Sequence, residues 1–91
     1  MVFLKEHLNG NYQWVAESRN SFFNGSPTRR LFDRLNGFQV LYIINSFGEQ
    51  SESFSIEEGK KIENLILNHL PLNPFSELSV INWLTIKNKS Q

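Results

Sequence analysis

The sequence predicts an all-α fold, a single small domain of four or five helices spanning residues 1–91. Residues that typically begin helices recur through the last two thirds of the chain, at Ser26-Pro27, Asn36, Ser55 and Asn73-Pro74. Apolar residues between these positions follow at three- and four-residue spacing, as they do along the buried face of a helix. Because 13% of the 91 residues are aromatic, a domain of this size can still bury a substantial core.

The first two helices are predicted on either side of Asn36-Gly37. Ser26-Pro27 predicts a helix that continues to about Leu35, because proline is favoured in the first turn of a helix and glycine just after its end. A second, largely buried helix is predicted over residues 38–47, since this run is rich in apolar residues and Gly48 follows it.

The third helix has the clearest beginning. Ser55 and Glu58 form a capping box, in which each side chain can bind the backbone N–H of the other residue. An apolar stripe follows at helical spacing, and Pro71 predicts the end of the helix because the residue before a proline disfavours helical angles. Gly59 in the first turn is unfavourable by about 1 kcal/mol relative to Ala. The close approach of another backbone would account for it.

The last helix is predicted to begin with Asn73 as its cap and Pro74 as its first residue. Its apolar side extends from Phe75 to Leu84, and the polar residues 87–91 are expected to fray. Together the helices predict a core of ten aliphatic residues: Leu31, Leu35, Leu41, Ile44, Ile62, Leu65, Ile66, Leu78, Ile81 and Leu84.

An α+β fold with an N-terminal β-hairpin and C-terminal helices is the alternative. Three of the five glycines lie in Asn-Gly pairs, the strongest short-range signal for a hairpin. Such a hairpin would pair Val2–Leu8 with Tyr12–Ala16, and Val40–Ile44 is also rich in strand formers. The sequence therefore leaves residues 1–16 and 38–47 open between helical and extended structure.

Composition excludes several classes of function. Cysteine is absent, which excludes disulfides, thiolate catalysis and cysteine-based zinc sites. Nine basic residues balance nine acidic ones, so no global field directs the chain to nucleic acid or to an anionic membrane. The opening residues lack the apolar core of a signal peptide, and the longest apolar run, Val40–Ile44, is far shorter than a membrane span. We therefore expect a cytoplasmic protein with no membrane partner.

No catalytic, metal or cofactor motif is recognisable. The acidic residues Glu57 and Glu58 do not complete an EF-hand in either register, and Gly59 lacks the neighbours of a phosphate-binding loop. The two histidines, His7 and His69, are far apart and have no paired ligands at helical spacing. The sequence predicts a non-enzymatic protein without metal or cofactor. An enzyme whose site is assembled from dispersed residues is a third hypothesis.

The arginines provide one functional hypothesis. All four lie in one 16-residue window, residues 19–34. Two of them fall in the first turn of a predicted helix, where a bound anion would relieve their unfavourable interaction with the helix dipole. The alternative is that they pair with acidic residues of the same chain or face water. The candidate contacts to an anion or a partner are Arg19, Ser26, Thr28, Arg29, Arg30 and Arg34.

Four aromatic residues provide the other hypothesis. They are Trp14, Phe22, Phe23 and Phe54, which lie beside turns and linkers, and aromatic side chains left on a surface often mark a partner contact. The alternative is a structural role, in which these aromatic residues close the ends of a helical bundle. We expect a protein-interaction or regulatory module that docks an apolar, arginine-bearing face onto a protein partner or onto itself. The alternative is local binding of nucleic acid or a phosphorylated ligand through the arginine window, by contacts to phosphates.

Overall fold

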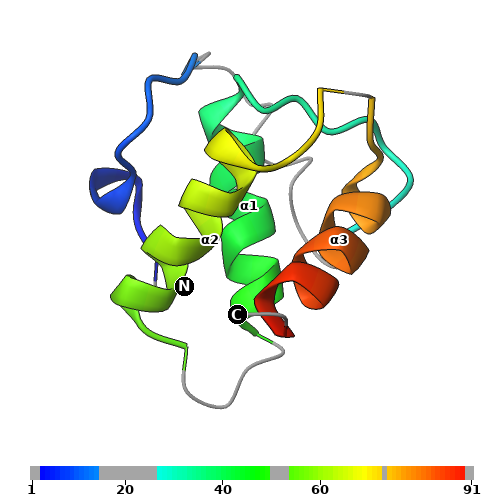
Figure 1. Cartoon of the computed structure of the whole chain (residues 1–91). Coiled ribbons are helices and arrows are strands. Elements are labelled where there is room, and N and C mark those ends of the chain that lie inside the picture. The colour runs from blue at the N-terminus through cyan, green and yellow to red at the C-terminus, as the bar shows by residue number, and fades with distance from the viewer. Residues whose placement is uncertain (1–2, 15–26, 50–53, 73, 90–91) are drawn as a thin grey trace.

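The computed structural model describes residues 3–14, 27–49, 54–72 and 74–89. These residues form three α-helices, α1 (Gly37–Gly48), α2 (Ile56–Asn68) and α3 (Glu77–Lys89), and one short 3-10 helix, η1 (Lys5–His7). Each α-helix contacts the other two, with α1 in the middle and the N-terminal segment beside α2 (Figure 1). The described residues contain no strand, so the all-α prediction is confirmed.

The central helix α1 is helical although its residues favour strands. The side chain of Asn36 accepts a hydrogen bond from the Phe38 N–H at 3.1 Å and so caps the helix. Val40, Ile43 and Ile44 are fully buried, because α1 is covered by the other elements on several sides. Burial of a helix that is apolar nearly all round outweighs the weak strand preference of its residues. The question left open for residues 38–47 is therefore resolved as helical.

The helix α2 begins as its sequence predicts, with the Ser55 hydroxyl accepting the Glu58 N–H at 3.2 Å. The glycine of its first turn has a specific cause. A Cβ at Gly59 would lie 2.2 Å from Cδ1 of Phe3, which is fully buried. The close approach to Gly59 is thus made by an aromatic ring and not by another backbone.

The helix α3 begins three residues later than predicted. The Ser76 hydroxyl accepts the Ser79 N–H at 3.1 Å, and Glu77 is the first helical residue. Pro74 lies outside the helix, and Asn73 lies outside the described residues. The next residue, Phe75, is held in place by the bond from the Phe32 N–H to its carbonyl, at 2.8 Å. The helix continues through Lys89, into the tail for which the sequence predicts fraying.

The helix predicted from Ser26-Pro27 to Leu35 is wrong over the described residues 27–35. This segment runs antiparallel to the start of α3, where Glu77 N–H donates to the Arg30 carbonyl at 2.9 Å and Leu78 N–H to the Thr28 carbonyl at 3.0 Å. Backbone groups used in such bonds are not available for helical ones. Tertiary pairing has therefore overridden the local start signal.

The N-terminal hairpin of the alternative fold is also wrong within residues 3–14. Lys5–His7 form a 3-10 turn, and Gln13 pairs instead with the backbone around the start of α1, donating to the Leu35 carbonyl at 2.7 Å and accepting the Gly37 N–H at 3.0 Å. Phe3 inserts into the core, and the Asn45 side chain satisfies its backbone on both sides, at 3.0 Å to its N–H and 2.9 Å to its carbonyl. The N-terminal segment is held by side chains of α1 and α2 rather than by a partner strand.

The predicted core is correct in its centre and wrong at its edge. Six of the ten residues are buried: Ile44, Ile62, Leu65, Ile66, Ile81 and Leu84. Leu41 is half-buried, while Leu31, Leu35 and Leu78 are exposed. Leu31 and Leu35 are exposed because their segment is not helical, and Leu78 because α3 turns the neighbouring residues Val80 and Ile81 inward. Phe3, Phe32, Val40 and Ile43 are core residues that the prediction omitted.

Candidate functional site

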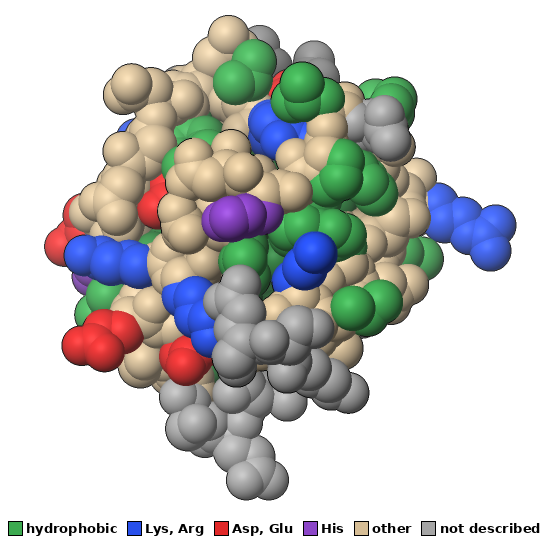
Figure 2. Space-filling view, viewed as in Figure 1, with side chains coloured by type: hydrophobic (Ala, Val, Ile, Leu, Met, Phe, Trp, Pro, Cys, Tyr) green, Lys and Arg blue, Asp and Glu red, His purple; other side chains and the backbone are tan. Residues whose placement is uncertain are grey.

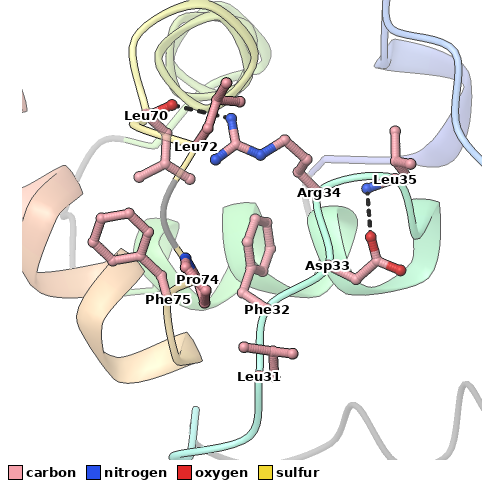
Figure 3. A pocket seen from close by; sticks show the side chains of 9 residues that line it. All are labelled: Leu31, Phe32, Asp33, Arg34, Leu35, Leu70, Leu72, Pro74 and Phe75. Atoms are coloured by element: carbon pink, nitrogen blue, oxygen red, sulfur yellow. Dashed lines mark hydrogen bonds between the residues drawn. The ribbon is translucent and has the colours of Figure 1, made fainter.

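An apolar cavity lies between the segment 31–35, which precedes α1, and the connection 70–75 between α2 and α3. It has a volume of about 320 Å³. The rings of Phe32 and Phe75 flank it, with Leu70, Leu72 and Arg34 along one edge (Figure 3). The lining consists of Leu31, Phe32, Asp33, Arg34, Leu35, Leu70, Leu72, Pro74 and Phe75.

The floor of the cavity is buried and its rim is not. Phe32 and Leu70 belong to the core, whereas Leu31 is 64%, Leu35 is 54% and Leu72 is 90% exposed. Across the face seen in Figure 2, hydrophobic side chains gather over the α2–α3 connection and α3, with Lys and Arg between them. Apolar groups clustered around a hollow often mark a binding surface, because isolated ones are common but contiguous ones are not.

The segment 31–35 owes its conformation to two polar side chains. The Asp33 carboxylate accepts the Leu35 N–H at 2.9 Å, which closes a turn. Buried Gln39 of α1 accepts the Asp33 N–H at 2.7 Å and donates to the Leu31 carbonyl at 3.0 Å. The exposed side chains of Leu31 and Leu35 therefore extend from a backbone that is fixed by three hydrogen bonds.

The opposite side of the cavity is fixed by Arg34. Its guanidinium donates to the Leu70 carbonyl at 3.0 Å, to the Ile66 carbonyl at 3.5 Å and to the Pro71 carbonyl. These carbonyls lie at and just beyond the C-terminal end of α2, where a positive charge is favourable. Arg34 thus links the α2–α3 connection to the segment 31–35.

A buried carboxylate holds the rest of this segment. Glu77 accepts hydrogen bonds from Arg30 Nε at 2.8 Å, Arg30 Nη2 at 3.1 Å, the Thr28 N–H at 3.0 Å and the Gln39 side chain at 2.8 Å. Burial opposes the ionisation of Glu77, but the hydrogen bonds from Arg30, Gln39 and Thr28 outweigh it and hold the pKa of this carboxyl below its ordinary value. The site is built around a satisfied ionic network.

A second buried carboxylate anchors the N-terminal segment. Glu63 of α2 accepts the Asn9 N–H at 2.9 Å, the Gly10 N–H at 3.0 Å and the Tyr12 hydroxyl. Burial, together with this hydrogen bond and the negative charge of Glu63, raises the pKa of Tyr12. Both Glu63 and Gly59 lie on the face of α2 that the N-terminal segment covers. Residues four apart share one face of a helix, so this spacing is the signal in the sequence that could have indicated the covered face.

The described members of the arginine window do not converge on one open anion site. Arg30 pairs with Glu77, Arg34 binds carbonyls, and Arg29 is exposed. The Thr28 hydroxyl accepts the Arg30 N–H at 3.2 Å. Arg19 and Ser26 lie outside the described residues, so the prediction of anion binding stays a prediction.

The two aromatic candidates among the described residues, Trp14 and Phe54, are packed rather than left on the surface. Trp14 is half-buried against Phe38, with ring centroids 5.0 Å apart, and the Lys5 ammonium lies 4.5 Å from its ring. Phe54 is half-buried against Gly48. Phe22 and Phe23 lie outside the described residues. The exposed large apolar side chains that line the cavity are leucines.

Sequence reasoning missed Leu72, and a signal for it was present. Leu72 stands in the loop Pro71-Leu72-Asn73-Pro74, away from both helical stripes, so no helix face explains its apolar side chain. An apolar residue held between prolines in a loop is a candidate contact. The cavity itself could not be foreseen, because it joins two segments that are distant in the chain.

The described parts of the chain offer neither a membrane span nor a metal site. None of their helices is long and apolar enough to cross a membrane. Nor do these residues bring three His, Asp or Glu side chains together in a group that could hold a metal ion. Comparison with protein-family models, with curated proteins and with solved structures finds no match to this chain.

Proposed function

We propose that this chain is a non-enzymatic protein-interaction module, which binds an apolar side chain of a protein partner in the cavity between residues 31–35 and 70–75. The observation that carries the proposal is the combination of a preformed cavity of about 320 Å³ with a rim of exposed leucines. Interface energy is often concentrated where one large side chain enters such a hollow.

The size of the cavity suits this role. A cavity of about 150 Å³ is enough to hold benzene, so this one has room for a leucine or phenylalanine side chain together with part of its backbone. Burying such a side chain fully contributes about 1.5–3 kcal/mol. The two segments are already fixed by Gln39 and Arg34, so binding requires little additional ordering.

The polar groups of the lining favour this role over the alternatives. Catalysis usually needs several ionisable groups converging on one point, whereas the charged groups here are Asp33 and Arg34. Asp33 is part of a turn, and Arg34 binds carbonyl oxygens. A phosphate would have to compete with those carbonyls for Arg34, which makes an anion a less suitable ligand than an apolar side chain.

The proposal is tested by NMR titration of the full chain with N-acetyl-leucine amide, a neutral probe with one apolar side chain. We expect saturable shifts, in the millimolar range, of the backbone amides of Leu31, Phe32, Leu35 and Phe75. Leu31→Gln should abolish them. Ile86→Gln is the matched control, because Ile86 is 65% exposed, against 64% for Leu31, and does not line the cavity.

Two results would contradict the proposal. One is the absence of saturable shifts at the cavity under conditions where the chain is a monomer. The other is an equal loss in both variants, which would mean that the probe coats any exposed apolar group. Titration with a short RNA or DNA at low salt tests the alternative function, and binding that weakens in Arg29→Ala would favour it.

A further inference from the structure

The cavity has a protruding apolar side chain on its own rim. Leu72 is 90% exposed, and it lies on the same edge as Leu70 and Arg34 (Figure 3). With this exposure, Leu72 contributes little to the packing of the described part of its own chain. The same face therefore carries both an apolar knob and a hole large enough to receive one.

We infer that the partner of this face is a second copy of the chain, which pairs about a two-fold axis so that Leu72 of each copy enters the cavity of the other. The inference rests on the proposed function of the cavity. A two-fold interface uses the same patch on both subunits and must be self-complementary. A knob beside its own hole meets this requirement, whereas a site for an unrelated partner would need only the hole.

The charges of the patch are also self-complementary. Asp33 lines the cavity, and Arg29, of opposite charge, is exposed two residues before the segment 31–35. Across a two-fold axis, Asp33 of one copy can face Arg29 of the other, in both directions at once. A strongly acidic partner would be repelled by Asp33 and a strongly basic one by Arg29, so a surface of mixed charge fits best.

The size of the molecule allows such an interface. A standard interface removes about 800 Å² from each partner, which is roughly one seventh of the 5889 Å² that this chain exposes. The chain is also formally neutral at pH 7, so two copies have no long-range repulsion to overcome.

Sedimentation equilibrium of the full chain, from about 1 µM to 1 mM, tests the inference. We expect the mass to rise with concentration from 10.6 kDa toward twice that value. Leu72→Gln should weaken dimerisation by roughly 100-fold, because each lost leucine accounts for about tenfold and symmetry counts it twice. Ile86→Gln should behave as the unmodified chain. Since Leu72 is exposed, its substitution leaves the fold intact, which far-UV circular dichroism verifies.

The charge pairing is tested separately with Asp33→Asn. Asparagine keeps the oxygen that accepts the Leu35 N–H, so the turn is preserved while the charge is removed. We expect the dimer to dissociate several-fold more readily and to lose part of its salt dependence. An unchanged dissociation constant would contradict the orientation proposed here.

The outcomes distinguish this inference from the function on which it rests. A monomer at 1 mM, or a dimer that Leu72→Gln leaves unchanged, overturns the two-fold pairing. If that monomer still binds N-acetyl-leucine amide in the cavity, the interaction function stands and its partner is a different protein. If the probe does not bind and the dimer does not form, both are overturned.

Discussion

Gly59 of α2 offers a sharp test of how the N-terminal segment is packed. In an ordinary helix, replacing glycine with alanine stabilises the fold by about 1 kcal/mol. Here the added Cβ would lie 2.2 Å from Cδ1 and 2.5 Å from Cε1 of Phe3, a ring that is fully buried and cannot swing into solvent without leaving the core. We expect Gly59→Ala to destabilise the protein.

The magnitude follows from two limits. If the ring shifts locally, overpacking costs about 1–3 kcal/mol, offset by the gain of about 1 kcal/mol from helix propensity. If the ring is expelled, the loss approaches the 3–5 kcal/mol typical of removing a buried phenylalanine, with the same offset. The net destabilisation should therefore be about 0–2 kcal/mol if the ring shifts and about 2–4 kcal/mol if it is expelled. In a Phe3→Ala background the obstacle is gone, and the same substitution should stabilise by up to about 1 kcal/mol.

Urea unfolding of the unmodified chain, the two single variants and the double variant measures this double-mutant cycle. The expected signature is a change of sign, with Gly59→Ala unfavourable when Phe3 is present and favourable when it is absent. A stabilising Gly59→Ala in the otherwise unmodified chain would refute the packing of Phe3 against α2. Equal effects in the two backgrounds would do the same.

Two further predictions concern the buried carboxylates. The pKa of the Glu77 carboxyl is lower in the folded than in the unfolded chain, so its ionisation contributes stability that is fully present above about pH 4.3 and is lost as the pH falls through the folded pKa. Glu77→Gln should lower the free energy of unfolding by about 2–4 kcal/mol at pH 7 and reduce its dependence on pH between pH 3 and pH 7, as measured by urea unfolding. The same pH dependence in the variant and the unmodified chain would contradict the role of ionised Glu77. Tyr12→Phe removes the hydroxyl that donates to Glu63, so we expect a loss of about 1.5–3 kcal/mol and faster hydrogen exchange at the Asn9 and Gly10 amides, whereas unchanged exchange would mean that the segment is held by other contacts.

Parts of the fold whose causes are local could be predicted from the sequence. The Ser55 cap and the apolar stripe after it define α2, because a capping hydroxyl and helical spacing both act within one or two turns. The Asn36 cap likewise marks the start of α1. Short-range signals are sufficient where no long-range hydrogen bonds stabilise a different conformation of the same residues.

The same kind of signal failed at Ser26-Pro27 and Asn73-Pro74, where long-range bonds compete. The residues 28–32 pair with the start of α3, and Glu77 binds Thr28 and Arg30 from 49 and 47 residues away. Such partners are not apparent from spacing along the chain. The candidate arginines illustrate the consequence, because two of them are used inside the fold.

By itself, the sequence determined the helical class, the caps of α1 and α2 and the centre of the core. Only the tertiary structure decided that Leu31 and Leu35 face solvent, that Phe3 requires Gly59, and that segments about 40 residues apart enclose a cavity. The physical reason is the distance along the chain over which each interaction acts. Caps and stripes act over a few residues, whereas a cavity depends on how backbone bonds and buried charges bring distant segments together.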